Sequence, residues 1–123
     1  MGQRTMTGAE VRALCLGLPE TTEKETWGDE TTPGHPTFRV RDKIFVIMAE
    51  DGSGGSIKTS HGEQGELVSA FPDAARVAAY VGRYGWTDVE FAGIPDEILR
   101  EIVEGAWART APKKLAEAWR ASR

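Results

Sequence analysis

At 123 residues and 40% hydrophobic content, the chain suits one domain with its own core and is too short for two ordinary ones. Its formal net charge of −4 and pI of about 5.2 differ from the basic balance of a dedicated nucleic-acid binder, so any such role would depend on a local patch. The single cysteine, Cys15, excludes an internal disulfide, and the absence of a long apolar run or signal-like start predicts a soluble cytoplasmic protein without a membrane partner.

We expect a single domain over residues 1–123. Residues 1–6 are predicted to be a loose leader, and the first helix follows them. Thr7-Gly8-Ala9-Glu10 matches a capping box and predicts a helix that runs to about Gly17. Pro19 ends this helix, because the residue before a proline disfavours the helical conformation. Its buried stripe is predicted to be Val11, Leu14, Cys15 and Leu18, which makes the cysteine a small apolar core group.

Two strands are predicted next, over residues 36–41 and 44–49, with Asp42-Lys43 as the turn between them. Phe38 and Val40 alternate with Arg39 and Arg41, so one face of the first strand is apolar and the other is cationic. A β-prone segment before them leads into Trp27-Gly28 as an earlier strand.

The second half of the chain alternates short strands with helices. The Gly- and Ser-rich segment Glu50–Ser56 predicts a flexible connection that contributes nothing to the core. Pro95, Asp96 and Glu97 suit the start of a helix, where a missing N–H is harmless and negative charge is favoured. The predicted elements are strands over Ser56–Thr59, Arg76–Val81 and Trp86–Phe91 and helices over Gly62–Phe71, from Pro95 onward, and over Lys113–Ala121.

Together these elements predict an α+β fold with an antiparallel sheet and helices packed on one face. The expected order is one helix, three or four strands, a helix, two strands and two final helices. Runs of adjacent strands separated by helices are typical of antiparallel hairpins covered on one side.

Several short motifs give the chain a family resemblance: Leu18-Pro19, Trp27-Gly28, the run His35–Phe45, Tyr80 and Gly85-Trp86. In combination, from about Ala13 to Leu115, they resemble the MmcQ/YjbR family of small bacterial proteins. The resemblance implies an α-β(3)-α-β(2)-α fold, similar to CyaY and to the type III secretion chaperones that bind extended peptides. The loop over residues 29–34 departs from the family pattern, in which the flanking motifs run almost together.

Members of this family are often labelled DNA-binding, and their paired hairpins have been likened to two wings. Carried over here, the wings are the hairpins around Asp42-Lys43 and Arg83-Tyr84-Gly85. The candidate phosphate contacts are then Arg39, Arg41, Lys43, Lys58 and Arg83. The alternative is that these are solvated charges on an exposed face, paired with Asp42, Asp88 and Glu90.

Aromatic side chains near the second hairpin are candidate contacts for a partner or ligand. If Val89 and Phe91 face the core, alternation leaves Trp86 partly exposed, and an exposed tryptophan is a good interface residue. Tyr84 is the second such candidate, and Trp27 is a weaker one. The alternative for all three is packing in the core or at its edge.

No catalytic or metal-binding signature is present, and no cofactor is expected. His35 and His61 lack metal-finger spacing, no cysteine pair accompanies them, and neither has a recognisable nucleophile motif. The Gly-rich segment lacks the Gly-Lys-Ser/Thr ending of a phosphate-binding loop. The C-terminal cations, from Arg109 to Arg123, are expected to complement the acids of the preceding helix.

The leading hypothesis is therefore a non-enzymatic binding domain whose family-implied partner is DNA. The alternative is a protein- or peptide-binding adaptor, which the acidic charge of the chain favours. An enzyme is the weakest of the three hypotheses, since it requires a pocket of perturbed titrating groups.

Overall fold

The structure, a computed structural model, describes residues 4–28, 34–79 and 81–123. It confirms the α+β class, and no helix in these ranges is long and apolar enough to cross a membrane. The helices are α1 (Gly8–Gly17), α2 (His61–Ala70), α3 (Asp96–Thr110) and α4 (Lys113–Ala121), with 3₁₀ turns η1 (Gly82–Tyr84) and η2 (Phe91–Gly93). The strands are β1 (Thr21–Thr26), β2 (His35–Val40), β3 (Lys43–Met48), β4 (Gly54–Lys58), β5 (Ala75–Val77) and β6 (Trp86–Glu90).

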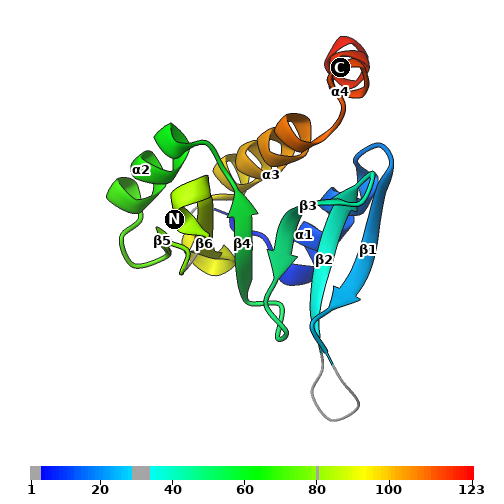
Figure 1. Cartoon of the computed structure of the whole chain (residues 1–123). Helices are drawn as coiled ribbons and strands as arrows, with labels where there is room; N and C mark the ends of the chain where they lie inside the picture. Colours follow the sequence, from blue (N-terminus) through cyan, green and yellow to red (C-terminus); the bar gives the residue numbers. More distant parts are fainter. Residues whose placement is uncertain (1–3, 29–33, 80) are drawn as a thin grey trace.

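The strands form one antiparallel sheet in the order β1-β2-β3-β4-β6-β5. Chain-adjacent strands pair directly from β1 to β4, and β6 then inserts between β4 and the short edge strand β5. Figure 1 shows α1 and α3 behind the sheet, α2 beside β5 and β6, and α4 at the far end of α3. The predicted antiparallel sheet with helices on one face is confirmed.

One face of the sheet is buried under helices α1 and α3. Phe38, Val46 and Ile57 lie opposite one another on β2, β3 and β4, and all three are fully buried. Trp107 of α3 is fully buried, and its indole N–H donates to the Pro19 carbonyl oxygen at 3.0 Å. Burying large side chains of this kind stabilises the fold by about 1.5–3 kcal/mol each. This apolar layer is the core that orients the sheet.

Local sequence signals set the helix starts. The predicted capping box of α1 is present, with Glu10 N–H donating to the Thr7 hydroxyl at 3.1 Å. A second capping box, formed by Ser60 and Glu63, begins α2. Helix α3 follows Pro95 as predicted. Each box satisfies backbone N–H groups that have no partner inside the helix.

The turn between β2 and β3 lies one residue earlier than predicted. Arg41 and Asp42 both have positive φ, +48° and +67°, and Lys43 is already the first residue of β3. Two consecutive positive φ angles match the right-handed twist of a tight hairpin. Arg41 therefore belongs to the turn, and the prediction that it shares a strand face with Arg39 is wrong.

Three other boundaries differ from the prediction. Strand β1 ends at Thr26, because Trp27 has a φ of +68° and leaves the extended conformation. The flexible connection is shorter than expected, since Gly54 already belongs to β4. Strand β5 covers only Ala75–Val77, and η1 is the next element.

Two features of the family resemblance lie outside the described residues. They are residues 29–33 of the loop that departs from the family pattern, and the motif residue Tyr80.

The expected loose leader does not extend through its last residues. Thr5 forms an isolated β-bridge with Pro95, and Met6 is buried with 5% of its surface exposed. The Asp96 N–H donates to the Arg4 carbonyl oxygen at 2.9 Å. Residues 4–6 are therefore part of the folded domain and contact the start of α3.

We predict opposite effects for two Gly→Ala substitutions. A Cβ at Gly55 in β4 would lie 2.4 Å from the Ile47 carbonyl oxygen, so Gly55→Ala should destabilise the fold by about 1–3 kcal/mol. Gly65 in α2 has nothing within 4 Å of such an atom, and Gly65→Ala should stabilise by about 0.5–1 kcal/mol. Urea unfolding measures both. Equal stability of Gly55→Ala and the unmodified chain would contradict the close approach of β3 and β4.

Candidate functional site

The sheet face opposite α1 and α3 is not covered by any described element. Ile47, Ser56 and Asp88 lie opposite one another on β3, β4 and β6, and each is partly exposed, in contrast to the buried residues on the other face. We call this surface the open face. By the strand alternation it also carries Arg39 on β2 and Lys58 on β4.

A row of cationic and apolar side chains crosses the open face near one end. Arg39 lies opposite Ile44, and Lys58 lies opposite Trp86. Strand β3 separates β2 from β4, so the backbones of Arg39 and Lys58 are roughly 10 Å apart at ordinary strand spacing. We call Arg39, Ile44, Lys58 and Trp86 the cationic row. Arg39 and Lys58 are therefore the two candidate cations that share the open face.

Neutral hydroxyl groups hold the Arg39 side chain against the sheet. Its Nε donates to Thr37 Oγ1 at 3.1 Å, and its Nη2 donates to Thr26 Oγ1 at 3.0 Å. Thr37 is itself fixed, because its hydroxyl donates to the Lys24 carbonyl oxygen at 2.6 Å. These partners orient the guanidinium without neutralising its charge.

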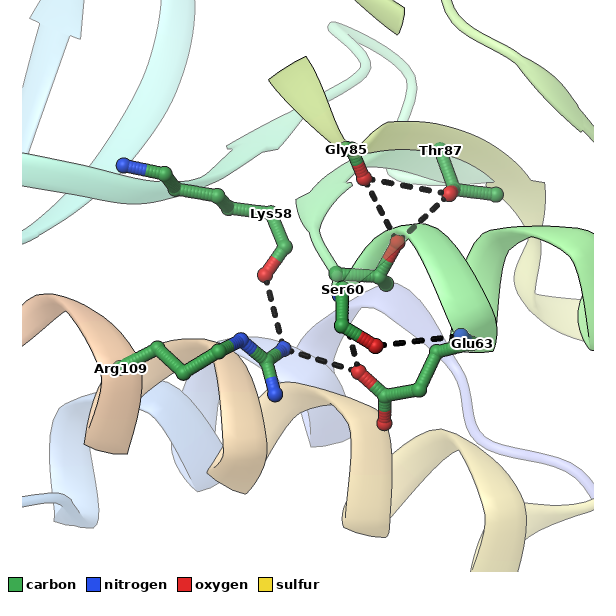
Figure 2. A network of polar contacts seen from close by, with 7 residues as sticks. Lys58, Ser60, Glu63, Gly85, Thr87 and Arg109 are labelled. Carbon is green, nitrogen blue, oxygen red and sulfur yellow. Dashed lines mark hydrogen bonds and ion pairs between the residues drawn. The ribbon is translucent and has the colours of Figure 1, made fainter. Parts of the chain in front are cut away.

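A polar network fixes the backbone at Lys58, as Figure 2 shows. Arg109 Nη2 donates to the Lys58 carbonyl oxygen at 3.0 Å and lies 2.9 Å from Glu63 Oε1. Next to it, the Thr59 hydroxyl donates to the Gly85 carbonyl oxygen at 2.6 Å. The network ties the end of β4 to α2, α3 and the start of β6, while the Lys58 ammonium points away from Arg109.

The remaining predicted cations are dispersed around the open face. Arg41 makes a two-pronged contact with Glu20, at 2.8 and 3.1 Å, and this guanidinium lowers the pKa of the Glu20 carboxyl. Lys43 is exposed at the start of β3. Arg83 lies in η1, the turn that precedes β6, with its guanidinium carbon 4.9 Å from the centre of the Tyr84 ring. The five candidates therefore do not form one continuous basic surface.

The aromatic candidates lie as the alternation predicts. Val89 and Phe91 are buried, and Trp86 is partly exposed on the open face. Tyr84 is 58% exposed and Trp27 is 65% exposed, so neither belongs to the core. Trp86 is the one that shares a surface with the cations of the row.

A hollow of about 400 Å³ opens beside the cationic row, where β3, β4 and β6 meet. The Ser56 hydroxyl donates to Asp88 Oδ1 inside it, and Arg76 Nη2 lies 3.9 Å from Glu90 Oε1. Among the described residues no three His, Cys, Asp or Glu side chains cluster as a metal site would require. The hollow is lined mainly by His35, Ile47, Ser56, Arg76, Asp88 and Glu90.

Two pairs of side chains that shape this surface, Arg109 with Glu63 and Ser56 with Asp88, were not predicted from the sequence. Arg109 was grouped with the C-terminal cations, and its partner Glu63 lies far away in the sequence. The Ser60-x-x-Glu63 capping box was a readable signal, because this pattern marks a helix start. The pairing of Ser56 with Asp88 has no local signal, since only the insertion of β6 beside β4 brings them together.

Cys15 is excluded as a nucleophile by its surroundings. The side chain is fully buried in the core, and this burial raises the pKa of its thiol to about 12, with a further contribution from the Glu23 carboxylate. A thiolate is the reactive form, so the native thiol is inert. The predicted role of Cys15 as a small core group is confirmed.

We predict that Cys15 does not react with Ellman's reagent at pH 8 while the chain is folded. Denaturation in guanidinium chloride should expose the thiol and release one equivalent of thionitrobenzoate, which absorbance at 412 nm measures. Rapid stoichiometric release from the native protein would contradict the burial of the thiol.

Comparison with known proteins finds a matching family and a solved structure with a similar fold. The YjbR family model matches residues 16–109. A crystal structure of the Deinococcus radiodurans protein DR2400, with a domain described as DUF419, is similar with a TM-score of 0.71 and 21% identity, over 85% of this chain and 78% of that chain. No curated protein matches. The family match spans most of the chain, from α1 to the last turn of α3, and on this ground the chain belongs to the YjbR family.

Proposed function

We propose that this domain is a non-enzymatic binding module that takes an extended acidic polypeptide segment across its open face. The observation that carries the proposal is the cationic row, in which Arg39 lies opposite Ile44 and Lys58 lies opposite Trp86 on the same face of the sheet. A partner laid on this row would meet two positive charges and a partly exposed apolar surface at once.

The charges of the row are available to a partner. Arg39 is held by the neutral hydroxyls of Thr26 and Thr37. Lys58 forms no ion pair with any residue in the described ranges, and its ammonium points away from Arg109 in Figure 2. Because a carboxylate would not have to displace an internal acid, binding gains charge complementarity without breaking a pair.

The apolar members of the row suit a polypeptide. Trp86 and Ile44 are partly exposed, each opposite one of the two cations, and interfaces typically combine aromatic anchors with a polar rim. An extended segment presents alternate side chains to one side, so acidic and apolar residues can reach the row together.

DNA, the partner implied by the family resemblance, is less well supported by the geometry. Affinity for DNA grows with the number of phosphates neutralised. Arg41 is paired with Glu20, and Arg83 lies in the η1 turn rather than on a strand of the row. Exposed Tyr84 with Arg83 above its ring remains the feature that favours nucleic acid, and DNA is therefore included in the test.

We predict that Lys58→Gln weakens binding of an acidic extended peptide about fivefold, equivalent to about 1 kcal/mol and at the upper end for a partly exposed ion pair. Fluorescence anisotropy with a labelled peptide of alternating Glu and Val measures the affinity at low and physiological salt. Arg120→Gln, which removes an exposed cation of α4, is the matched control and should leave binding unchanged.

A labelled DNA duplex of mixed sequence serves as the competing ligand in the same assay. Binding of the peptide but not the duplex at low salt supports the proposal. Binding of the duplex alone would assign the row to nucleic acid, and loss of affinity in both variants to the same extent would remove the row from the interface.

A further inference from the structure

The hollow lies directly beside the cationic row but has the opposite charge. Its two carboxylates, Asp88 and Glu90, face one guanidinium, Arg76, which is 3.9 Å from Glu90 Oε1. Asp88 is partly exposed, and the Ser56 hydroxyl donates to only one of its oxygens, Oδ1. Among the described residues nothing donates to the other oxygen, so it is available to an incoming donor.

The hollow is large enough for a side chain. A volume of about 400 Å³ lies within the usual range of ligand sites, which begins at about 300 Å³. Gly54 shares the open-face side of β4 with Ser56 and Lys58, and it has no side chain to fill the space. Ile47 supplies an apolar wall against which a methylene chain can pack.

The spacing between hollow and row matches one step along an extended chain. Lys58 and Ser56 are two residues apart on β4, as Trp86 and Asp88 are on β6. Two residues of a strand span roughly 6.6–6.8 Å. A segment that runs along β4 and β6 crosses the cationic row at Lys58 and Trp86. When its acidic residue pairs with Lys58, the side chain two positions away lies over Asp88.

We propose that the hollow receives a lysine or arginine side chain located two residues from the acidic residue of the bound segment. This inference rests on the proposed function and specifies its partner, an extended segment of the form acidic-x-basic or basic-x-acidic. The ammonium or guanidinium donates to the free oxygen of Asp88, and its methylene chain packs against Ile47. The open face thereby recognises an acidic and a basic residue that are two positions apart in an extended segment.

The test is a double-mutant cycle between the domain and its peptide. Two pairs of labelled peptides carry Glu-Val-Lys or Lys-Val-Glu in an extended Val/Thr context, and each is compared with a version in which Gln replaces Lys. In the unmodified domain this replacement should weaken binding of one pair about fivefold, measured by anisotropy. With Asp88→Asn it should change binding less than 1.5-fold, because the acceptor charge is gone.

The matched control is Glu66→Gln, which removes an exposed acid of α2 and should preserve the fivefold effect. Thermal unfolding checks that Asp88→Asn is folded, and Asp88→Thr, which also removes the carboxylate and suits a strand position, replaces it if it is not. An equal effect of the Lys→Gln replacement in the unmodified domain and in Asp88→Asn would overturn the inference while leaving peptide binding by the row intact.

A second measurement tests the hollow without any peptide. Titration with Nα-acetyl-lysine amide or Nα-acetyl-arginine amide, followed by ¹H–¹⁵N NMR, should shift the amide signals of Ser56, Asp88 and Glu90. The neutral analogue Nα-acetyl-norleucine amide should not. Absence of these shifts at several hundred millimolar probe, the range in which so weak a contact becomes populated, overturns the inference. Shifts together with failure of every peptide to bind would overturn the proposed function alone.

Discussion

The candidate site depends on the packing of α3 against β3 and β4, because this packing determines which face of the sheet is covered and which is open to a partner. Trp107 is fully buried at the centre of this packing, donates to the Pro19 carbonyl oxygen and lies 5.1 Å from the Trp119 ring. That one side chain of α3 contacts the segment that follows α1 and the Trp119 ring of α4. Because α1 and α3 occupy the same side, Phe38, Val46 and Ile57 are buried and the opposite face stays open. The candidate site exists because the helices cover one face only.

The cationic row differs from the rest of the surface in how its arginine is held. Around the rim, arginines pair with acids, as in Arg41 with Glu20 and Arg123 with Glu104. Such exposed pairs contribute little stability, but they neutralise cations that would otherwise attract an anion. In the cationic row Arg39 is held by hydroxyls instead. An acidic chain can therefore present a local positive surface.

Local sequence signals predicted the elements well and their ends less well. The capping box at Thr7 and the proline at residue 95 mark helix starts, because each solves a backbone hydrogen-bonding problem within a few residues. The alternation around Val89 correctly left Trp86 partly exposed. The turn at Arg41 was misplaced by one residue, since positive φ in a non-glycine residue has no reliable local signature. That single shift separates Arg41 from Arg39.

The amino-acid sequence by itself determined the fold class, the family and the apolar and polar faces of β2 and β6, because these depend on periodicity and short motifs. Only the tertiary structure decided which charges meet. The insertion of β6 between β4 and β5 brings Ser56 to Asp88 and Lys58 to Trp86. The Arg109–Glu63 pair likewise joins two helices that are distant in the chain. Such partners are chosen by packing of the whole sheet, and no local pattern encodes them.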